Sequence, residues 1–381
     1  MFNGKASLTI VHTESSLGWG GQERRILREL ELMQSQGNRV FLIAPERSEI
    51  FKQAVRRRIP AFAGHFKRKQ FVGEILRLKS IFKKLSPDIV ATHSSRDGWV
   101  SALAAKIAGV PLVLKYRHVS VPVRRGLLNR WHYRGLYKMV VATSREIVSR
   151  IQEAIPMTDD RLAVIPTGVD LKLFSPDAPK LDLRAELGLA RESRLIGVVS
   201  VLRSWKGHEH LILAMQKLLP DFPELCLVIV GEGGQRKNIE ELILRQGLEQ
   251  HIFLIGQRED VPGILRSLDL LVLPSVQKEG IPQIILQAFA AGTPVVGTDI
   301  GGVREVLTPE RGWRVPPANP DALAAAIEEA LRHSELTTSK AKAALAHVAR
   351  EHSGDRMIEQ TLDAYRRFLK SDENSSHSKA V

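Results

Sequence analysis

The sequence contains a single cysteine and no long apolar run. Cys226 lies alone inside the run LCLVIV, which excludes a disulfide framework and a cluster of thiolate metal ligands. We expect its side chain to be a small buried apolar group rather than a catalytic thiol. No apolar run reaches the roughly 20 residues that cross a bilayer, and the opening segment MFNGKASLTIVHT lacks the regions of a signal peptide. These absences predict a cytoplasmic protein.

Two glycine-rich loops lack the residues of the common nucleotide-binding fingerprints. The loop GWGGQER is not followed by Gly-Lys-Ser/Thr, and Glu23 stands where GxGxxG requires its third glycine. The loop GEGG, at residues 231–234, departs in the same way, with Arg236 at that position. Both departures argue against a nicotinamide-dependent dehydrogenase. Because GWGGQER opens a predicted helix, it fits the phosphate side of a ligand, although each loop by itself also fits an ordinary tight turn.

Acidic residues are scarce in the first half of the chain. The chain has 381 residues, 44% hydrophobic and 25% charged, which excludes a disordered or fibrous protein and allows two domains. Its net charge of +13 is uneven, because residues 1–165 hold 29 Lys and Arg against 13 Asp and Glu, and the remainder holds 26 against 29. Basic clusters occur at 56–58, 67–69, 83–84 and 124–125. The charge excess therefore belongs to one half.

The last basic cluster runs into the segment GLLNRWHYRGLYK, which contains Trp131, Tyr133 and Tyr137. Basic residues mixed with interfacial aromatic residues suit an anionic membrane surface or a polyanionic substrate. A solvated surface without a partner remains the alternative for any one cluster. Nucleic acid ranks last as a partner, because no reading helix, stacking sheet or zinc module accompanies the charge.

Short β-branched runs alternate with amphipathic stretches along the chain, which predicts an α/β fold with parallel sheets covered by helices on both faces. The segment 174–194 carries prolines and charges but no buried strand, so we place the domain break there. We expect two doubly wound, Rossmann-like domains at 1–180 and 190–354, and a disordered polar tail at 371–381. Whether an amphipathic helix at 355–370 completes the first domain is left open by its periodicity. The expected strands are SLTIVHT, RVFLIAP, DIVATH, VPLVLKYRH, MVVATS, LAVIPTG, LIGVVSVL, LCLVIVG, IFLIG, LDLLVLP and TPVVGTD, and the expected helices include 22–36, 209–219, 236–246 and 283–291.

Polar residues and glycines follow the expected strands, where parallel sheets bind ligands. Arg203 and Lys206 stand at a predicted helix start and suit a diphosphate, and Glu279 precedes another helix start and suits sugar hydroxyls. A solvated Arg–Lys pair is the plainer alternative. We expect the two sheets to present these edges to a shared cleft. The residues concerned are Gly18, Gly20, Gly21, His93, Ser94, Ser95, Arg117, His118, Thr167 and Gly168 in the first half, and Arg203, Lys206, Gly207, the glycines of 231–234 and Glu279 in the second.

Together these motifs resemble glycosyltransferase family 4, whose members are retaining enzymes of the GT-B fold that use nucleotide diphosphate sugars. The resemblance covers roughly residues 7–335. It depends most on the block IGQREDVPGILRSLDLLVLPSVQKEGIPQIILQAFAAGTPVVGTDIGGVREVL, whose order of acidic loop, small-residue helix and GTPVV strand is specific. The segments GGQER, THSSRDGWVSALAAKIAGVPLVLKYRH, IPTGVDLKLFSP, SWKGHEHLI and VGEGGQRKNIEEL support it.

The resemblance implies roles for the matching residues. On the donor side, Lys206 would neutralise phosphate charge, and Glu279, the first glutamate of the Glu-x7-Glu motif, would contact sugar hydroxyls. His118 would lie beside the reacting sugar. No metal ion, cofactor or protein nucleophile is required, because the leaving phosphate assists front-face attack. The resemblance also implies that Gly20 and Gly21 approach the donor diphosphate, that Arg258 lies beside the base, and that His93, Asp97 and Arg117 lie on the acceptor side, with Asp97 touching acceptor or orienting His118.

Two positions depart from the family pattern. The second glutamate of the motif is replaced by Gln287, whose neutral amide accepts a hydrogen bond about 1 kcal/mol more weakly than a carboxylate. We therefore expect weaker or altered ribose binding, unless Gln287 is only a polar surface residue. The arginine that usually stands five residues before the lysine is replaced by Val201, and Arg203 is a candidate substitute.

The sequence thus predicts a glycosyltransferase that moves a sugar from a nucleotide diphosphate donor to a membrane-associated saccharide, such as a lipopolysaccharide core or a lipid-linked glycan. We expect it at the inner face of the cell membrane. A nucleotide-sugar 2-epimerase of the same fold is one alternative. A non-catalytic saccharide- or polyanion-binding protein with a degenerate site, suggested by Gln287 and Val201, is the other. The motifs do not specify the donor base, the sugar or the acceptor.

Overall fold

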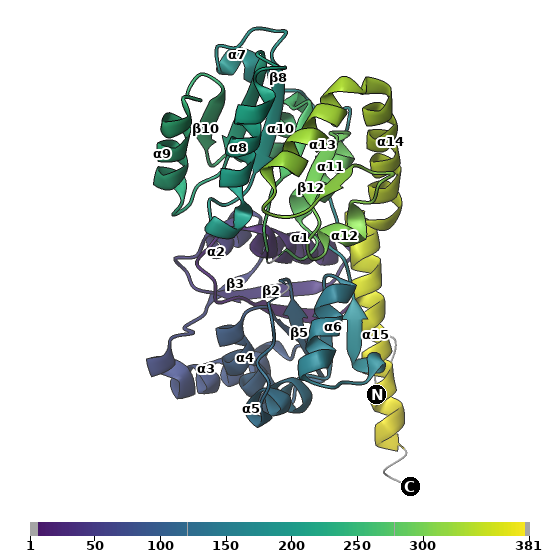
Figure 1. Ribbon diagram of the computed structural model, residues 1–381. Helices are drawn as coiled ribbons and strands as arrows, with labels where there is room; N and C mark the ends of the chain where they lie inside the picture. Colours follow the sequence, from purple (N-terminus) through teal and green to yellow (C-terminus); the bar gives the residue numbers. More distant parts are fainter. Residues whose placement is uncertain (1–6, 120, 278, 378–381) are drawn as a thin grey trace. The chain divides into compact units, whose positions relative to one another are not determined.

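The chain folds into two units, each with its own parallel sheet (Figure 1). The computed structural model describes residues 7–119, 121–277 and 279–377. Unit 1 comprises Met1–Gly168 and Gly354–Val381, and unit 2 comprises Val169–Ser353. The segment 174–194, where the sequence places a break, belongs to unit 2. Among the described helices none is long and apolar enough to cross a membrane.

Unit 1 has a seven-stranded parallel sheet in the order β3-β2-β1-β4-β5-β6-β7. Successive strands are added in one direction from β1 to β3 and in the opposite direction from β4 to β7, which is the doubly wound arrangement that places ligands beyond the strand ends. The strands are β1 (Thr9–Thr13), β2 (Arg39–Ala44), β3 (Ala61–Ala63), β4 (Ile89–Thr92), β5 (Leu112–Arg117), β6 (Met139–Ala142) and β7 (Leu162–Val164). The helices are α1 (Gly21–Ser35), α2 (Glu49–Arg56), η1 (Arg68–Gln70), α3 (Phe71–Leu85), α4 (Ser95–Ala108), α5 (Leu127–Trp131), the π-helical η2 (His132–Leu136), α6 (Arg145–Ala154), η3 (Asp159–Arg161) and α15 (Gly354–His377).

Unit 2 repeats this architecture with a six-stranded parallel sheet in the order β10-β9-β8-β11-β12-β13. The strands are β8 (Arg194–Val199), β9 (Leu225–Val230), β10 (Ile252–Gly256), β11 (Leu270–Leu273), β12 (Val295–Thr298) and β13 (Trp313–Val315). The helices are α7 (Leu183–Glu186), η4 (Ser204–Lys206), α8 (His208–Leu218), α9 (Arg236–Gln246), α10 (Val261–Ser267), α11 (Gln283–Ala291), α12 (Val303–Val306), α13 (Pro320–Arg332) and α14 (Ser334–Glu351).

The predicted secondary structure is confirmed for every expected strand, and the four named helices agree within one residue at each end. The sequence missed β3 and β13, which lie at sheet edges. Each has only three residues, so neither produces the continuous apolar run by which a buried parallel strand is recognised. Cys226, the second residue of β9, is buried as predicted, and burial raises the pKa of its thiol.

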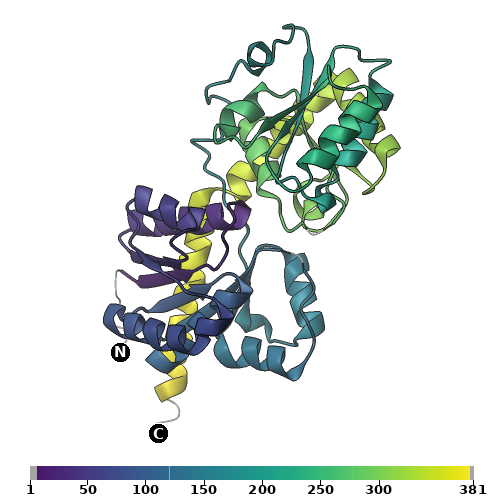
Figure 2. The same ribbon diagram turned by 90° about the vertical axis from the view of Figure 1, so that its left-hand side faces the viewer.

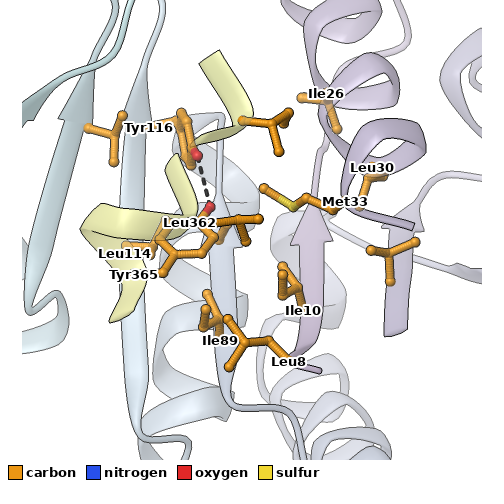
Figure 3. Packing of buried hydrophobic residues seen from close by; sticks show 14 of the residues in the cluster. Leu8, Ile10, Ile26, Leu30, Met33, Ile89, Leu114, Tyr116, Leu362 and Tyr365 are labelled. Atoms are coloured by element: carbon orange, nitrogen blue, oxygen red, sulfur yellow. Dashed lines mark hydrogen bonds between the residues drawn. The ribbon is translucent and has the colours of Figure 1, made fainter. Parts of the chain in front are cut away.

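The final helix α15 packs on unit 1 and completes its core. Figure 3 shows Leu362 and Tyr365 of α15 among side chains of α1 and of the central strands. The hydroxyls of Tyr116 and Tyr365 are 2.8 Å apart, so the helix is tied to β5 by a buried hydrogen bond. Figure 2 shows α15 lying along this sheet. The helix continues to His377, into the predicted tail at 371–381, and residues 378–381 lie outside the described chain.

The expectation that three aromatic residues of the segment 126–138 lie at an interface is wrong for two of them. Tyr133 and Tyr137 are only 4% and 1% exposed and belong to the packed interior. Their rings pack against His132, and the Tyr137 hydroxyl donates to the carbonyl of Gly98 at 2.6 Å. Trp131 remains on the surface, 48% exposed.

Candidate functional site

In unit 2 the structure brings Lys206 and Glu279 into direct contact. Lys206 ends η4, between β8 and α8, and Glu279 follows β11, the neighbouring strand. The Lys206 Nζ lies 2.5 Å from Glu279 Oε1, and the Ser275 hydroxyl donates to the same oxygen at 2.7 Å. Glu279 is 7% exposed, so its carboxylate is held in one orientation at the carboxyl edge of the sheet. A cation and a carboxylate fixed here suit a ligand that carries both phosphate and hydroxyl groups.

The turn after Lys206 requires a glycine. Gly207 has a φ of 69°, and a Cβ there would lie 2.0 Å from the carbonyl oxygen of Pro274. The backbone of the β8 loop therefore packs directly on the loop that follows β11. This close approach explains how residues so far apart in sequence as Lys206 and Glu279 meet.

Three other residues predicted on the donor side also lie in unit 2, namely Arg203, Arg258 and Gln287. None of the side-chain contacts described for them involves Lys206 or Glu279. The guanidinium of Arg203 lies 5.0 Å from the ring centroid of Trp205. Arg258 donates to both carboxylate oxygens of Asp260, at 2.9 and 2.6 Å, and also to Glu186. This pairing raises the pKa of Arg258 and lowers that of Asp260. Gln287 is half-buried on α11. The ligand roles of these residues stay predictions.

In unit 1 the loop GWGGQER starts helix α1, as predicted. Gly20 is the N-cap residue, and its backbone N–H donates to Glu23 Oε2 at 2.8 Å, which is the glutamate half of a capping box. The residue that breaks the dinucleotide fingerprint therefore has a local function, because it satisfies a backbone group at the helix start. Gly21 is the first residue of α1. The position of both glycines beside a diphosphate stays a prediction.

The two predicted histidines of unit 1 are hydrogen-bonded to each other, and His93 is also bonded to a third histidine, His12, that the sequence analysis missed. His93 Nδ1 lies 2.8 Å from His118 Nε2, and His93 Nε2 lies 2.9 Å from His12 Nδ1. Burial is the largest cause that lowers the pKa of each ring, and it lowers that of His12 to about 3. All three rings are therefore neutral near pH 7. His12 gave no sequence signal, because a lone histidine at the end of an apolar run is usually structural.

Asp97 contacts the backbone of His93, and its predicted role toward acceptor or His118 stays a prediction. Its carboxylate accepts from the backbone N–H groups of His93 and Ser94, at 2.9 and 3.0 Å, and from the hydroxyls of Thr13 and Ser15, both at 3.1 Å. It thereby caps α4 and fixes the loop that carries His93. Burial raises the pKa of Asp97 to about 6. The side chain of Arg117 donates to the Val121 carbonyl at 2.5 Å and so ties down the loop after β5.

A second residue missed from the sequence is Glu14, which follows β1 directly. Its carboxylate is completely buried and accepts from the Ser94 hydroxyl at 2.5 Å, from the Ser16 N–H at 2.7 Å, and from Gln22. Burial, with the nearby Asp97 charge, raises the pKa of Glu14 to about 7. Burial also lowers the pKa of Lys115, to about 8. The edge of the sheet in unit 1 thus gathers several buried titratable groups. Among the residues that the structure describes, no cluster of three or more potential ligands could hold a metal ion.

Two family models match consecutive parts of the chain. The model described as Glycosyltransferase Family 4 matches residues 19–173, and the model described as Glycosyl transferases group 1 matches residues 179–347. The chain belongs to family 4 of the glycosyltransferases. This confirms the resemblance inferred from the motifs, and the enzyme uses a nucleotide sugar as donor.

Similar proteins cover most of the chain of this glycosyltransferase. It is 28% identical over 316 residues to the UDP-Gal:alpha-D-GlcNAc-diphosphoundecaprenol alpha-1,3-galactosyltransferase of Escherichia coli, covering 78% of this chain and 81% of that enzyme. It is 27% identical over 362 residues to the phosphatidyl-myo-inositol mannosyltransferase of Mycobacterium leprae, covering 91% and 92%. A glycosyltransferase structure from Rickettsia africae ESF-5 superposes with a TM-score of 0.87 at 23% identity, covering 96% of this chain and 100% of that one. The match to this solved structure shows the GT-B fold.

The family decides between the activities that the sequence left open. Both models describe glycosyl transfer, so the epimerase and the non-catalytic binding protein are not carried further. In this glycosyltransferase the first glutamate of the Glu-x7-Glu motif is the one that the structure places on Lys206, at 2.5 Å. The substituted second position, Gln287, lies eight residues further along the chain and is the fifth residue of α11.

Proposed function

We propose that this enzyme transfers a sugar, with retention of anomeric configuration, from a nucleotide diphosphate sugar to a saccharide acceptor held at a membrane. In this proposal unit 2 binds the donor and unit 1 receives the acceptor. The observation that carries the donor part is the Lys206–Glu279 pair, 2.5 Å apart at the carboxyl edge of the second sheet. The pair supplies a cation for phosphate and a carboxylate for sugar hydroxyls within one contact.

The proposed reaction exchanges one bond at the anomeric carbon for another. The bond from this carbon to the diphosphate oxygen breaks, and a bond to the acceptor hydroxyl oxygen forms on the same face. The hydroxyl proton passes to the departing phosphate oxygen. Lys206 stabilises the negative charge that develops on the leaving group, and Glu279 orients the sugar by accepting hydrogen bonds from its hydroxyls. No covalent enzyme intermediate is needed.

The acceptor part of the proposal is supported by the charge of unit 1. Between Asp97 and Glu146 the chain has nine Lys and Arg and no Asp or Glu. Within this stretch α5 exposes apolar side chains, with Leu127 83% and Leu128 68% exposed. Exposed arginines flank them, at positions 124, 125, 130 and 134. An apolar surface rimmed by cations fits an anionic lipid surface better than it fits bulk water.

The names of the similar proteins agree with this choice. The E. coli relative acts on an undecaprenol-linked GlcNAc diphosphate, and the M. leprae relative acts on phosphatidyl-myo-inositol. A relative from Rhizobium meliloti is a lipopolysaccharide core mannosyltransferase. Two of these names specify a phosphate-bearing lipid acceptor, and the third names the lipopolysaccharide core. We therefore place this enzyme peripherally at the inner face of the cell membrane.

The direct test is a transfer assay with UDP-glucose, UDP-galactose and GDP-mannose, each labelled in the sugar, and a lipid extract of the source membrane. The proposal predicts label in the lipid fraction with at least one donor, and an α-linkage from an α-donor. Epimerised donor, or tight donor binding without any turnover, would contradict it. Heat-denatured enzyme and extract from which glycolipid has been removed are the controls.

A further inference from the structure

Three histidines of unit 1, His12 and His93 buried and His118 half-buried, form a continuous hydrogen-bonded chain. His12 lies in β1, His93 follows β4, and His118 follows β5, and these three strands are neighbours in the sheet. The two links of the chain are 2.9 Å, from His12 Nδ1 to His93 Nε2, and 2.8 Å, from His93 Nδ1 to His118 Nε2. The middle ring also stacks on Tyr116, with ring centroids 4.6 Å apart. Stacking and two hydrogen bonds leave the His93 ring one orientation.

If the three histidine rings are neutral, their protons can be arranged in only two ways. Each neutral imidazole has one N–H and one bare nitrogen, so each link has one donor and one acceptor. In the first arrangement His12 donates to His93, and His93 donates to His118. In the second, both links run the other way. The positive charges of Arg25, Lys115 and Arg117 oppose a third possibility, a protonated ring.

His12, at the buried end of the row of hydrogen-bonded histidines, decides between the two arrangements. The Nε2 atom of His12 is buried and has no hydrogen-bond partner in the described structure. In the second arrangement this atom would carry a buried N–H without an acceptor, which native proteins rarely tolerate. In the first it is a bare nitrogen, which the positive charge of Arg25 favours. The first arrangement is therefore the more stable one, and every ring in it carries its proton on Nδ1.

We propose that His12 and His93 are positioning residues that lock His118 in its Nδ1–H tautomer, so that His118 acts on the substrate as a neutral hydrogen-bond donor. Among the hydrogen bonds of the described residues none involves the Nδ1 atom of His118, whereas its Nε2 is bonded to His93. The group that it meets must then offer a lone pair, as a sugar hydroxyl or a phosphoryl oxygen does. His118 cannot take up the acceptor proton at Nδ1, so it does not serve as a general base. Only the contact with substrate rests on the proposed function.

The tautomers can be measured directly by NMR on the full chain labelled with ¹⁵N in histidine. Long-range ¹H–¹⁵N correlation spectra at pH 7.5 distinguish a protonated from a bare ring nitrogen, and single variants assign the signals among the 12 histidines. The proposal predicts Nδ1–H for all three rings, although Nε2–H is the usual form in water. An Nε2–H tautomer at His93 or His118 would overturn it. Since no substrate is present, this result does not depend on whether the transfer activity is correctly assigned.

A matched pair of variants then tests the consequence for catalysis. In His12→Asn the amide Nδ2 stands near the place of the ring Nδ1 and can still donate to His93, whereas His12→Leu fills the space without a donor. We expect His12→Asn to keep kcat within about twofold of the wild type, and His12→Leu to lower kcat about tenfold with little change in the donor KM. If His12→Asn and His12→Leu have equal thermal stability and equal kcat values, His12 contributes only packing, and its proposed role in positioning His118 is contradicted. If His12→Leu does not fold, the tautomers of the wild-type protein decide the question alone.

Discussion

Glu279 carries the proposed donor-sugar contact, and its orientation depends on Lys206 and Ser275. The replacement Glu279→Gln keeps an oxygen that can accept from both neighbours but removes the negative charge. We predict a loss of transfer rate of about 100-fold, the usual size for one charged contact in a transition state. Thermal unfolding should stay within a few degrees of the wild type. Glu249→Gln, at an exposed position of the same unit, is the matched control, and equal rates for both variants would refute the assigned role.

Glu14 offers a prediction on pH-dependent stability. Its folded-state pKa is about 7, above the usual value of 4.5, so ionisation is harder in the folded protein than in the unfolded chain. The wild type should therefore lose stability as pH rises from about 4.5 to 7, while Glu14→Gln lacks this loss. Relative to the wild type, the variant should gain about 1–3 kcal/mol of unfolding free energy between pH 4.5 and 8. Denaturant unfolding of both proteins at several pH values checks this. A difference that does not vary with pH would show that Glu14 is already ionised at low pH.

The residues of the candidate site were predictable from sequence only where they follow a strand in a recognisable motif. Lys206 and Glu279 could be expected to meet, because both precede helices at the same edge of one sheet. His12 and Glu14 could not, since their partners stand about 80 positions away and nothing local distinguishes them from core or surface residues. For Asp97 the sequence left open whether it touches acceptor or orients His118, and spacing does not reveal that its carboxylate binds the His93 backbone.

Among the elements, the short helix α5 is the one whose surface fits a membrane. We predict that the double replacement of Leu127 and Leu128 by Asp weakens binding to vesicles of phosphatidylglycerol and phosphatidylcholine by tenfold or more. Inserting two leucines contributes roughly 1–3 kcal/mol each, and the new carboxylates repel anionic lipid. Leu244→Asp is the control, at a leucine of α9 that is 66% exposed. Vesicle co-sedimentation measures the effect, and equal binding by the double variant and the control would remove α5 from the account.

The helix α15 shows a limit of prediction at the level of elements. Its amphipathic pattern predicts a helix, but periodicity alone does not say which of two sheets it covers. The structure answers this through the side chains of Leu362 and Tyr365, which join the core of unit 1 (Figure 3). Leu362→Ala should lower the unfolding free energy by about 2–4 kcal/mol, as expected for a buried leucine that leaves a cavity. A loss below 1 kcal/mol in denaturant unfolding would indicate that the helix is not part of that core.

At the scale of the whole molecule, charge divides between the two halves of the chain. Residues 1–165 carry a net +16, from 29 basic and 13 acidic residues, and the remainder carries −3, from 26 and 29. Attraction to an anionic surface acts over about a Debye length, which shortens from about 10 Å at 0.1 M salt to 3 Å at 1 M. Vesicle binding should therefore weaken steeply as salt rises. Binding that is unchanged by salt would point to apolar contacts alone.

The central claim is that Lys206 holds the diphosphate of a nucleotide sugar in unit 2. It is tested most directly by thermal unfolding of the full chain with UDP, GDP or ADP, because a ligand that binds the folded state raises the unfolding temperature. At about 100 times Kd the effect is about 2.7 kcal/mol, or several degrees. We predict such a rise for the wild type and for the control Lys237→Met with at least one nucleotide, and its loss in Lys206→Met. The same rise in Lys206→Met as in the wild type would contradict the account.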